Sequence, residues 1–488
     1  MASRMEGTGE GEFASGPLSL RHAALFTDLY ELTMAASYVR EQMTGTATFS
    51  LFVRSLPKVR SFLVAAGLED ALAYLQALRF SDEAIRYLRS LGRFDERFLD
   101  FLRTVRFTGE VRAVPEGTVL FADEPLLEIT APIIEAQLVE TAVINFCHFQ
   151  TVLASKAVRS VIAARGRPVV EFGLRRTPGT DAGLKAARSA YLAGADMSSN
   201  LLAGLAYGIP PMGTMAHSYI VAFPEEVDAF RAFARAFPDH TTLLIDTYDT
   251  VAAAHKAVTV AKEMEARGHR LRGVRLDSGD LDTLSRQVRR ILDAAGLDYV
   301  RIVASGGLDE EVIDDLMTRG APLDAFGVGT RMDVSADAPY LEMAYKLVRY
   351  DGRHVLKTST GKETWTGEKQ VYRARGPDGR FGHDLLTLRE EPPPPGAEPL
   401  LTPVMAGGAR LGSPPALPAI RAHCAAQVAA LPDAVTRLRD PASYTVRYSE
   451  RLVAVQREVK AEVEPTQRAR SSVTAAPVRS PGESRDPA

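Results

Sequence analysis

VVEFGLRR, residues 169–176, is the first of seven short apolar runs that decide the fold of this 488-residue chain. The other six follow in order: GADMSSN (194–200), PPMGTMAHS (210–218), TTLLIDTYD (241–249), GVRLDSGD (273–280), RIVASGG (301–307) and DAFGVGT (324–330). Helical patterns such as GLKAARSAYLAG separate them. Strands of a parallel sheet are buried on both faces and read as continuous apolar stretches, and parallel barrels carry their functional side chains where the strands end. The seven runs therefore predict an α/β sheet whose strand-end residues converge on one site.

The number of runs is one fewer than the eight strands of a closed barrel, so we expect an irregular or incompletely closed α/β barrel over residues 151–335. Residues 19–150 mix helical patterns with β-rich pieces, which predicts an N-terminal α+β domain. Residues 336–465 contain further β-like pieces and a polar helix, and we expect them to pack with that domain. Residues 1–18 and 466–488 lack bulky apolar groups and are predicted to be disordered tails.

The composition excludes several classes of protein. Apolar residues make up 46% of the chain, enough for a sizeable core, and 58 Lys and Arg against 61 Asp and Glu leave no basic field for nucleic acid or an anionic membrane. Only Cys147 and Cys424 are present, which excludes a disulfide framework and a multi-cysteine metal site. Neither a secretion signal nor a run of about 18 apolar residues occurs. We therefore expect a cytoplasmic protein with no nucleic-acid partner and no membrane.

Two strand ends carry cationic or titratable groups. Arg175 and Arg176 follow the first run, where a guanidinium group can hold a carboxylate or phosphate and can stack on a planar ring. The alternative for this arginine pair is an ion pair at the outer rim. His217 follows the third run and can act as a base or accept a phosphoryl group. Its alternative is a satisfied structural histidine at a strand end.

The fifth run ends in RLDSGD, which combines Arg275, two carboxylates and a glycine turn. Such a turn exposes backbone N–H groups, and Asp277 and Asp280 can together hold a Mg²⁺ ion that bridges phosphates. The alternative for Asp280 is a helix N-cap, and both interpretations are compatible because a capped helix start also attracts anions.

Glycines follow the last two strands, where barrels commonly bind a phosphate, although tight turns also require glycine. Near the N-terminus, Tyr30 in TDLYEL is an aromatic that can stack on a flat substrate, or simply a core residue of a helix. The chain has no GxxxxGK[ST] phosphate loop, GxSxG elbow or HExxH motif. If the protein uses ATP, it binds the nucleotide in another way.

Eight segments in order resemble the nicotinate phosphoribosyltransferase family. They are LFTDLYELTMAASY, FSLFVRSLP with FLVAAGLEDAL, EFGLRRTPGTDAGLKAARSAYLAGADMSSNLLAG, GTMAHSYIVAF, RLDSGDL, ASGGLDE, FGVGTRM and KQVYR, between about Leu25 and Arg373. The resemblance implies the type II phosphoribosyltransferase fold, an irregular seven-stranded α/β barrel with a discontinuous α+β sandwich domain. It also implies that nicotinate and 5-phosphoribosyl-1-pyrophosphate form nicotinate mononucleotide and pyrophosphate for NAD salvage, coupled to ATP hydrolysis through a phosphohistidine.

The resemblance also implies roles for single residues. The implied catalytic residues are His217, Arg275 and Asp277, with His217 as the phosphorylated histidine. The implied nicotinate-binding residues are Tyr30, Phe172, Arg175, Asp196 and Ser218, with Asp196 at the mouth of the site and Tyr30 supplied across a homodimer interface. The implied phosphoribosyl- and phosphate-binding residues are Ser278, Gly279, Ser305, Gly306, Gly307, Gly327, Gly329 and Thr330. Mg²⁺ is the implied cofactor, reached through pyrophosphate by Asp277 and Asp280, and ATP is the implied co-substrate.

One segment departs from the family pattern, since KTSTGKETWTGEKQ has Thr366 where proline is common, beside the only tryptophan, Trp365. The departure concerns the local turn and not the residues implied for the chemistry. Three alternatives stay open at this point: a nicotinamide-using sister enzyme, a silent barrel that binds nucleotide or a partner, and a generic phosphate-binding barrel enzyme. A second cation, Arg176, favours a carboxylate substrate over an amide.

Overall fold

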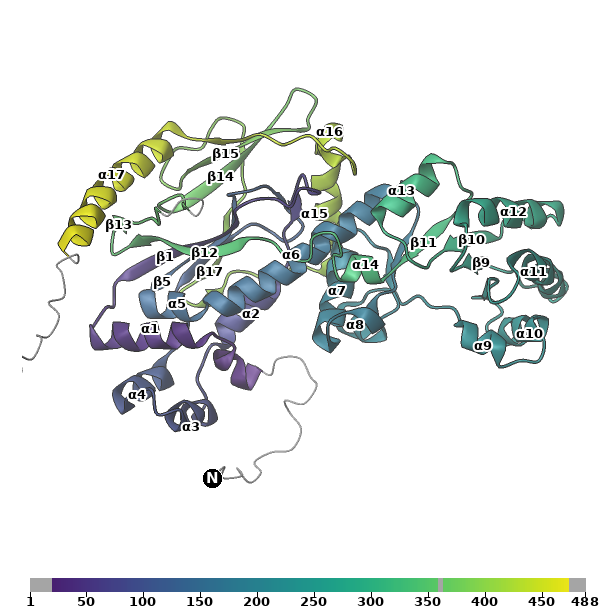
Figure 1. The fold of residues 1–488 in the computed structure, drawn as a ribbon, viewed down its shortest axis with the longest axis horizontal. Coiled ribbons are helices and arrows are strands. Elements are labelled where there is room, and N and C mark those ends of the chain that lie inside the picture. The colour runs from purple at the N-terminus through teal and green to yellow at the C-terminus, as the bar shows by residue number, and fades with distance from the viewer. Residues whose placement is uncertain (1–19, 359–362, 474–488) are drawn as a thin grey trace, which may run out of the picture.

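The computed structural model describes residues 20–358 and 363–473. Figure 1 shows two parts, an antiparallel β part and a parallel sheet flanked by helices, joined by the long helix α6 (Glu140–Ala163). The expected N-terminal tail lies outside the described residues. The expected C-terminal tail begins inside α17, which runs from Glu450 to Val473, and its remainder lies outside the described residues. Among the described helices, none has the length and hydrophobicity needed to span a membrane.

The antiparallel part is built from both ends of the chain. Its strands are β1 (Thr46–Val53), β2 (Leu63–Val64), β3 (Glu110–Ala113), β4 (Val119–Leu120), β5 (Pro125–Pro132), β12 (Met343–Tyr350), β13 (Arg353–His354), β14 (Lys369–Arg375), β15 (Phe381–Leu388), β16 (Glu398–Pro399), β17 (Thr402–Ala406), β18 (Ala409–Arg410) and β19 (Val446–Tyr448). The largest sheet has the order β13-β12-β1-β5-β3-β17-β18. Because β1 pairs with β5 on one side and with β12 on the other, residues from before and after the parallel sheet form one discontinuous domain.

Helices pack around this antiparallel part. They are η1 (Leu20–Leu25), α1 (Leu29–Arg40), α2 (Leu68–Ala77), α3 (Asp82–Ser90), α4 (Glu96–Thr104), α5 (Ile133–Leu138), α15 (Leu417–Ala429), α16 (Asp433–Thr436) and α17. Capping explains where several of them begin. The side chain of Ser81 accepts a hydrogen bond from the N–H of Ala84 at the start of α3, and Asp95 caps α4 through Phe98 in the same way.

The parallel sheet has six strands: β6 (Val169–Glu171), β7 (Met197–Ser198), β8 (Thr242–Leu244), β9 (Gly273–Leu276), β10 (Arg301–Ala304) and β11 (Ala325–Val328). Its order is β7-β6-β11-β10-β9-β8. The last strand, β11, pairs with the first, β6, which is the pairing expected of a barrel. In the described part of the chain β7 and β8 are the two edge strands and do not pair with each other. The six strands therefore form an incompletely closed sheet.

The prediction of seven strands is wrong by one. The run PPMGTMAHS makes only a single bridge, from Pro211 to Ser198 of β7. Pro210 and Pro211 have no N–H to donate, so this segment cannot extend a ladder. The sheet therefore opens at the segment that leads to His217.

Helices alternate with these strands. They are η2 (Leu174–Arg176), α7 (Thr180–Leu192), α8 (Leu201–Tyr207), α9 (His217–Val221), α10 (Glu226–Ala236), α11 (Thr250–Glu265), α12 (Leu281–Ala294), α13 (Glu310–Thr318) and α14 (Thr330–Asp333). The longer ones pack their apolar faces on the sheet, where Val274, Ile302 and Phe326 are fully buried. This packing fixes the strand ends from which the site is built.

The connecting helix α6 contacts α2 and β2 on one side and α7 and α13 on the other. Its buried cations Lys156 and Arg159 both reach Glu310 at the start of α13, with Nζ–Oε2 and Nε–Oε1 distances of 2.5 and 2.9 Å. Buried charges are costly unless they are paired. This pairing holds the start of α13, and with it the glycine loop that precedes α13, against α6.

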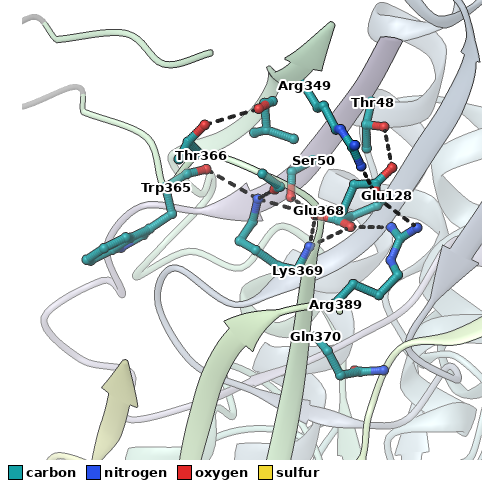
Figure 2. A network of polar contacts seen from close by, with 12 residues as sticks. Thr48, Ser50, Glu128, Arg349, Trp365, Thr366, Glu368, Lys369, Gln370 and Arg389 are labelled. Carbon is teal, nitrogen blue, oxygen red and sulfur yellow. Dashed lines mark hydrogen bonds and ion pairs between the residues drawn. The ribbon is translucent and has the colours of Figure 1, made fainter. Parts of the chain in front are cut away.

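Figure 2 shows a buried polar network that joins β5 to β14 in the antiparallel part. Lys369 Nζ lies 3.3 Å from Glu128 Oε1 and donates to the Gly367 carbonyl at 2.7 Å. Arg389 donates to the other Glu128 oxygen at 2.7 Å. Burial lowers the pKa of Lys369, although the Glu128 carboxylate opposes this shift. The network lies in the antiparallel part, away from the strand ends of the parallel sheet (Figure 1), so we assign it a structural role.

Thr366, the residue that departs from the family pattern, is fully buried beside this network (Figure 2). Its N–H donates to Gln456 Oε1 of α17 at 3.0 Å. Its hydroxyl donates to the carbonyls of Val348 and Val355 at 3.2 and 2.9 Å. Threonine thus supplies two donors that proline lacks.

Thr366→Pro is expected to lower the free energy of unfolding by about 2–4 kcal/mol, because it leaves buried acceptors without donors. Urea unfolding measures the change. Thr366→Ser keeps both donors and serves as the control, with an expected loss below about 1 kcal/mol. Equal stability of the proline variant and the parent chain would contradict this account of the turn.

Candidate active site

The carboxyl ends of β6, β9, β10 and β11 lie side by side. Ala304 pairs with both Leu276 and Phe326, and Val328 pairs with Glu171. The loops that follow these strands hold most of the candidate residues, namely Phe172, Arg175, Asp277, Ser278, Gly279, Asp280, Ser305, Gly306, Gly307, Gly329 and Thr330. The structure therefore brings them to one edge of the sheet, as the seven-run pattern predicts.

Arg275 is the centre of a hydrogen-bond network at this edge. Its Nη2 donates to Asp277 Oδ1 at 2.8 Å, and its Nε donates to Ser305 Oγ at 2.8 Å. The Ser305 hydroxyl in turn donates to Asp277 Oδ1 at 2.6 Å. The remaining nitrogen, Nη1, donates to Thr214 Oγ1 at 3.0 Å. A charged group held by three side chains is pre-organised, with little freedom left to lose when a ligand binds.

Asp277 is ionised in this network. Burial alone would raise its pKa, but the hydrogen bonds from Arg275 and Ser305 and the charge of Arg275 outweigh burial and lower it. The carboxylate is therefore negative throughout the neutral range. It can accept a hydrogen bond from a sugar hydroxyl or contact a cation.

His217 is the first residue of α9, and its ring faces Asp277. Its Nδ1 lies 3.1 Å from Thr247 Oγ1, and its Nε2 lies 3.8 Å from Asp277 Oδ2. The side chain is 42% exposed, so one edge of the ring is open to a ligand. An orienting hydroxyl on one nitrogen and a carboxylate near the other are features of a histidine that takes part in chemistry.

Asp246 is a site residue that the sequence analysis missed. It follows β8, and its Oδ2 accepts hydrogen bonds from the Asp277 N–H at 2.9 Å and the Ser278 hydroxyl at 2.6 Å. Its Oδ1 is buried and has no hydrogen-bond partner in the described residues. The signal was present in TTLLIDTYD, where carboxylate and hydroxyl residues follow a buried strand.

An aromatic side chain lines the interior of the sheet next to the network. The Arg275 guanidinium carbon lies 5.8 Å from the centre of the Phe172 ring. Both residues line a cavity of about 1040 Å³ that runs through the interior of the sheet, since its lining also includes Pro168, Gly273 and Arg301 at the amino-terminal strand ends. A Cβ atom at Gly327 would lie 2.5 Å from the Phe172 ring, so any larger residue there would displace the ring.

The loop after β10 approaches the network through its backbone. Gly306 has a φ of +84°, and a Cβ there would lie 1.7 Å from the Asp277 carbonyl oxygen. No side chain other than glycine's fits this contact. The loop after β10 therefore packs its backbone directly against the backbone of Asp277.

Three further candidates lie at the rim. Arg175 in η2, Ser218 in α9 and Thr330 at the start of α14 are exposed. In the described residues, no carboxylate forms an ion pair with Arg175 or Arg176. The rim ion pair that would explain these arginines structurally is therefore missing, and Arg175 is available to a ligand.

The structure corrects the placement of Asp196, which we expected at the mouth of the site. β7 begins only after Asp196, so this residue lies at the amino-terminal edge of the sheet. There its carboxylate accepts hydrogen bonds from the Val169 N–H at 3.0 Å and from Arg421 of α15 at 2.9 Å. Its observed partners are those of a structural residue.

Asp280 and Tyr30 are also away from the network. Asp280 caps α12 through the N–H and hydroxyl of Thr283, which is the N-cap alternative. Tyr30 lies on α1 and is 46% exposed. Figure 1 places α1 at the opposite end of the molecule from α9 and β9, so Tyr30 cannot reach the site of its own chain.

The comparisons with known proteins agree with this architecture. The family model described as nicotinate phosphoribosyltransferase N-terminal domain matches residues 25–148, the nicotinate phosphoribosyltransferase family model matches 168–374, and the C-terminal domain model matches 394–456. Nicotinate phosphoribosyltransferase pncB2 of Mycobacterium tuberculosis is 53% identical over 432 residues, covering 88% of this chain and 92% of that protein. The human nicotinate phosphoribosyltransferase is 33% identical over 88% of this chain and 95% of its own length.

Solved structures give the same answer. The crystal structure of human nicotinic acid phosphoribosyltransferase has a TM-score of 0.80 at 31% identity, covering 89% of this chain and 99% of that one. A nicotinate-nucleotide pyrophosphorylase from Pyrococcus furiosus has a TM-score of 0.70 at 26% identity, covering 86% and 98%. The chain therefore belongs to the nicotinate phosphoribosyltransferase family and is an enzyme with this activity.

Proposed function

We propose that the protein joins nicotinate to 5-phosphoribosyl-1-pyrophosphate in the cytoplasm for NAD salvage, and that ATP hydrolysis drives the reaction through a phosphorylated His217. The observation that carries this proposal is the 3.8 Å approach of His217 Nε2 to Asp277 Oδ2, within the network of Arg275 and Ser305. The test is a product assay with nicotinate and nicotinamide side by side. Nicotinate mononucleotide as the main product supports the proposal, and a preference for nicotinamide contradicts it.

The bond changes fit the groups at this edge. The pyridine nitrogen supplies an electron pair that forms the new bond to the anomeric carbon, the carbon–oxygen bond to pyrophosphate breaks, and pyrophosphate leaves with the two electrons of that broken bond. Positive charge grows on the sugar and negative charge on the leaving group, so the ionised Asp277 and the donors of Arg275 and the Gly306 loop can stabilise both. The substrate supplies the nucleophile, so the protein has only to orient the reactants.

Phe172 and Arg175 are the proposed nicotinate contacts. The Phe172 ring borders the cavity beside Arg275, where a flat pyridine ring can stack on it. Arg175 is exposed in the loop that follows, and its guanidinium matches the geometry of a carboxylate. A guanidinium pairs with a carboxylate more strongly than with a neutral amide, so this contact would favour the acid.

Arg175→Ala is expected to raise the KM for nicotinate about 10–100-fold, the cost of losing a charge-assisted hydrogen bond. The KM for 5-phosphoribosyl-1-pyrophosphate should change by less than about threefold, because the phosphates bind at other loops. Steady-state kinetics with each substrate varied in turn gives both values. Arg331→Ala is the control, since Arg331 is also exposed but pairs with Asp309. Equal losses for both substrates would remove Arg175 from the ring-binding role.

ATP coupling is proposed to use His217 as the phosphoryl acceptor. A ring nitrogen attacks the γ-phosphorus, the bond to the β-phosphate oxygen breaks, and ADP leaves; water later releases orthophosphate. A phosphoryl group adds about two negative charges beside Asp277. Those charges perturb the Arg275–Asp277–Ser305 network and so change its affinity for pyrophosphate.

Mg²⁺ is the proposed cofactor. The carboxylates of Asp246 and Asp277 suit it, because magnesium prefers oxygen ligands and Asp246 Oδ1 is a buried oxygen without a hydrogen-bond partner in the described residues. When bound there with the substrate, Mg²⁺ would neutralise charge on the departing pyrophosphate. Asp280 is the weaker candidate, since its oxygens are taken by Thr283.

We propose a homodimer in which Tyr30 completes the site of the partner subunit. Within one chain α1 is remote from the network (Figure 1). Helix α8, which follows the edge strand β7, also exposes apolar side chains, with Leu201 and Leu205 exposed by 74% and 85%. A second copy that seats α1 against this region would bury them and bring an aromatic to the nicotinate pocket.

A further inference from the structure

Two buried carboxyl groups lie next to the ring-binding loop, and the mechanism above does not use them. Glu171 is the last residue of β6 and immediately precedes Phe172; Asp333 is the last residue of α14. Their exposed fractions are 1% and 2%. Two carboxylates at such depth repel each other and lack solvation, so a folded protein must compensate for them.

Glu171 receives the available donors. Its Oε1 accepts the N–H of Gly173 at 2.5 Å, and its Oε2 accepts the hydroxyl of Ser198. Ser198 Oγ also accepts the N–H of Asn200 at 2.9 Å. The Glu171 carboxylate therefore ties the loop after β6 to the loop after β7.

Asp333 completes the pair from the third loop. Its Oδ2 is buried and has no hydrogen-bond partner in the described residues, and burial together with the neighbouring Glu171 carboxylate raises the pKa of Asp333. A Cβ on Gly173 would lie 1.9 Å from that oxygen, so the aspartate occupies the space next to the glycine. Asp333 thus connects α14, which follows Gly329, to the loop of Phe172.

The two carboxyl groups differ in their surroundings. Burial, followed by the charge and hydrogen bond of Glu171, raises the pKa of Asp333 well above its ordinary value. The backbone of Gly173 opposes this rise at Asp333 but does not outweigh it. Because Glu171 accepts both the Gly173 N–H and the Ser198 hydroxyl, we assign the negative charge to Glu171 and the proton to Asp333.

The neighbouring charges do not change this assignment. On α14, Arg331 pairs with Asp309, and on α6, which packs against α14, Lys156 and Arg159 pair with Glu310. Arg175 and Arg176 of η2 are exposed, and Asp196 before β7 pairs with Arg421. None of these groups forms an ion pair with Glu171 or Asp333 within the described residues.

We propose that Glu171 and Asp333 are a proton-sharing positioning pair that holds the loop of Phe172 and Arg175 in register with the loops after β7 and β11. The inference rests on the proposed binding of nicotinate by Phe172 and Arg175. Loss of the shared proton puts two negative charges in a buried space and pushes the three loops apart. Nicotinate affinity should then fall as the pH rises.

Two isosteric variants separate this role from simple packing. Asp333→Asn mimics the protonated aspartate and still donates to Glu171, so the KM for nicotinate at neutral pH should stay within about threefold and lose its alkaline rise. Glu171→Gln cannot accept from both donors, so its KM for nicotinate should rise about tenfold or more, with a smaller change for 5-phosphoribosyl-1-pyrophosphate. Glu124→Gln is the matched control, since Glu124 is a fully buried carboxyl paired with Asp384 in the antiparallel part. It should leave the pH profile of the nicotinate KM unchanged.

A spectroscopic readout keeps this test independent of the proposed function. Infrared difference spectra of the folded full-length protein at mildly alkaline pH should show a protonated carboxyl band that Asp333→Asn removes. Burial and Asp384 also raise the pKa of Glu124 well above its ordinary value, so Glu124→Gln should remove a separate band and leave that of Asp333 unchanged. Absence of that band from the Asp333 difference spectrum would overturn the proton-sharing pair, even if the protein uses nicotinate. If Glu171→Gln changes the KM values of both substrates equally, the pair does not position the nicotinate loop specifically, and that part of the proposal is wrong. Failure of the parent protein to use nicotinate would instead refute the proposed function and, with it, the positioning role.

Discussion

His217→Ala is expected to abolish nicotinate-dependent ATP hydrolysis and phosphoenzyme formation. The His217 ring is 42% exposed beside the network, and in the proposed mechanism its removal leaves the γ-phosphoryl group without an acceptor. The ATP-dependent gain in product formation, about 5–150-fold for ordinary coupling free energies, should disappear, while slow ATP-independent turnover should remain. Labelling with γ-phosphate-radiolabelled ATP, followed by gel electrophoresis without an acid step, measures the phosphoenzyme.

The control for this variant is His255→Ala, which removes an exposed histidine of α11 outside the network. It should retain full labelling and coupling. Labelling of His217→Ala at the level of the control would remove His217 from the phosphoryl-acceptor role, whatever the effect on overall rate.

The second large effect is expected from mixing two inactive variants. Asp277→Ala removes the carboxylate that Arg275 and Ser305 hold, and should cost about 10²–10³-fold in kcat. Tyr30→Ala removes the aromatic that α1 would give to a partner. In a shared-site dimer each variant damages a different component of the composite site, so a mixed dimer contains one intact site.

Random exchange of the two variants should therefore restore about a quarter of the parent activity, since half of the dimers are mixed and each has one good site of two. The measurement is the rate after co-refolding or co-expression of the two chains. Mixing Asp277→Ala with Arg275→Ala is the control and should restore nothing, because both residues belong to the same component of the site. Lack of rescue in the Tyr30 mixture would show that each chain forms its site alone.

The grouping of the residues at the strand ends could be predicted, because buried parallel strands appear in the sequence as continuous apolar runs. The runs that begin at residues 273, 301 and 324 each contain a strand of the parallel sheet. Arg275, Asp277 and Ser305 form hydrogen bonds with one another where those strands end. A parallel sheet brings neighbouring strand ends together, so spacing along the chain was sufficient to group them.

Other features depend on contacts that no local pattern encodes. The run at 210–218 looks like the other six, but its two prolines remove the donors a ladder needs. Asp196 and Met197 are adjacent in sequence, yet the late start of β7 puts Asp196 at the wrong edge for the site. The pair of Glu171 and Asp333 joins residues 162 positions apart, and only the closure of β11 against β6 brings them together.

The most direct test of the central claim is the extent of nicotinate mononucleotide formation at equilibrium, with and without ATP, in the presence of added pyrophosphate. If His217 couples ATP hydrolysis to the Arg275–Asp277–Ser305 network, ATP raises the product ratio well above its ATP-free value, and orthophosphate is released with each product molecule. An identical product ratio with and without ATP, or orthophosphate release that does not depend on nicotinate, would contradict the account.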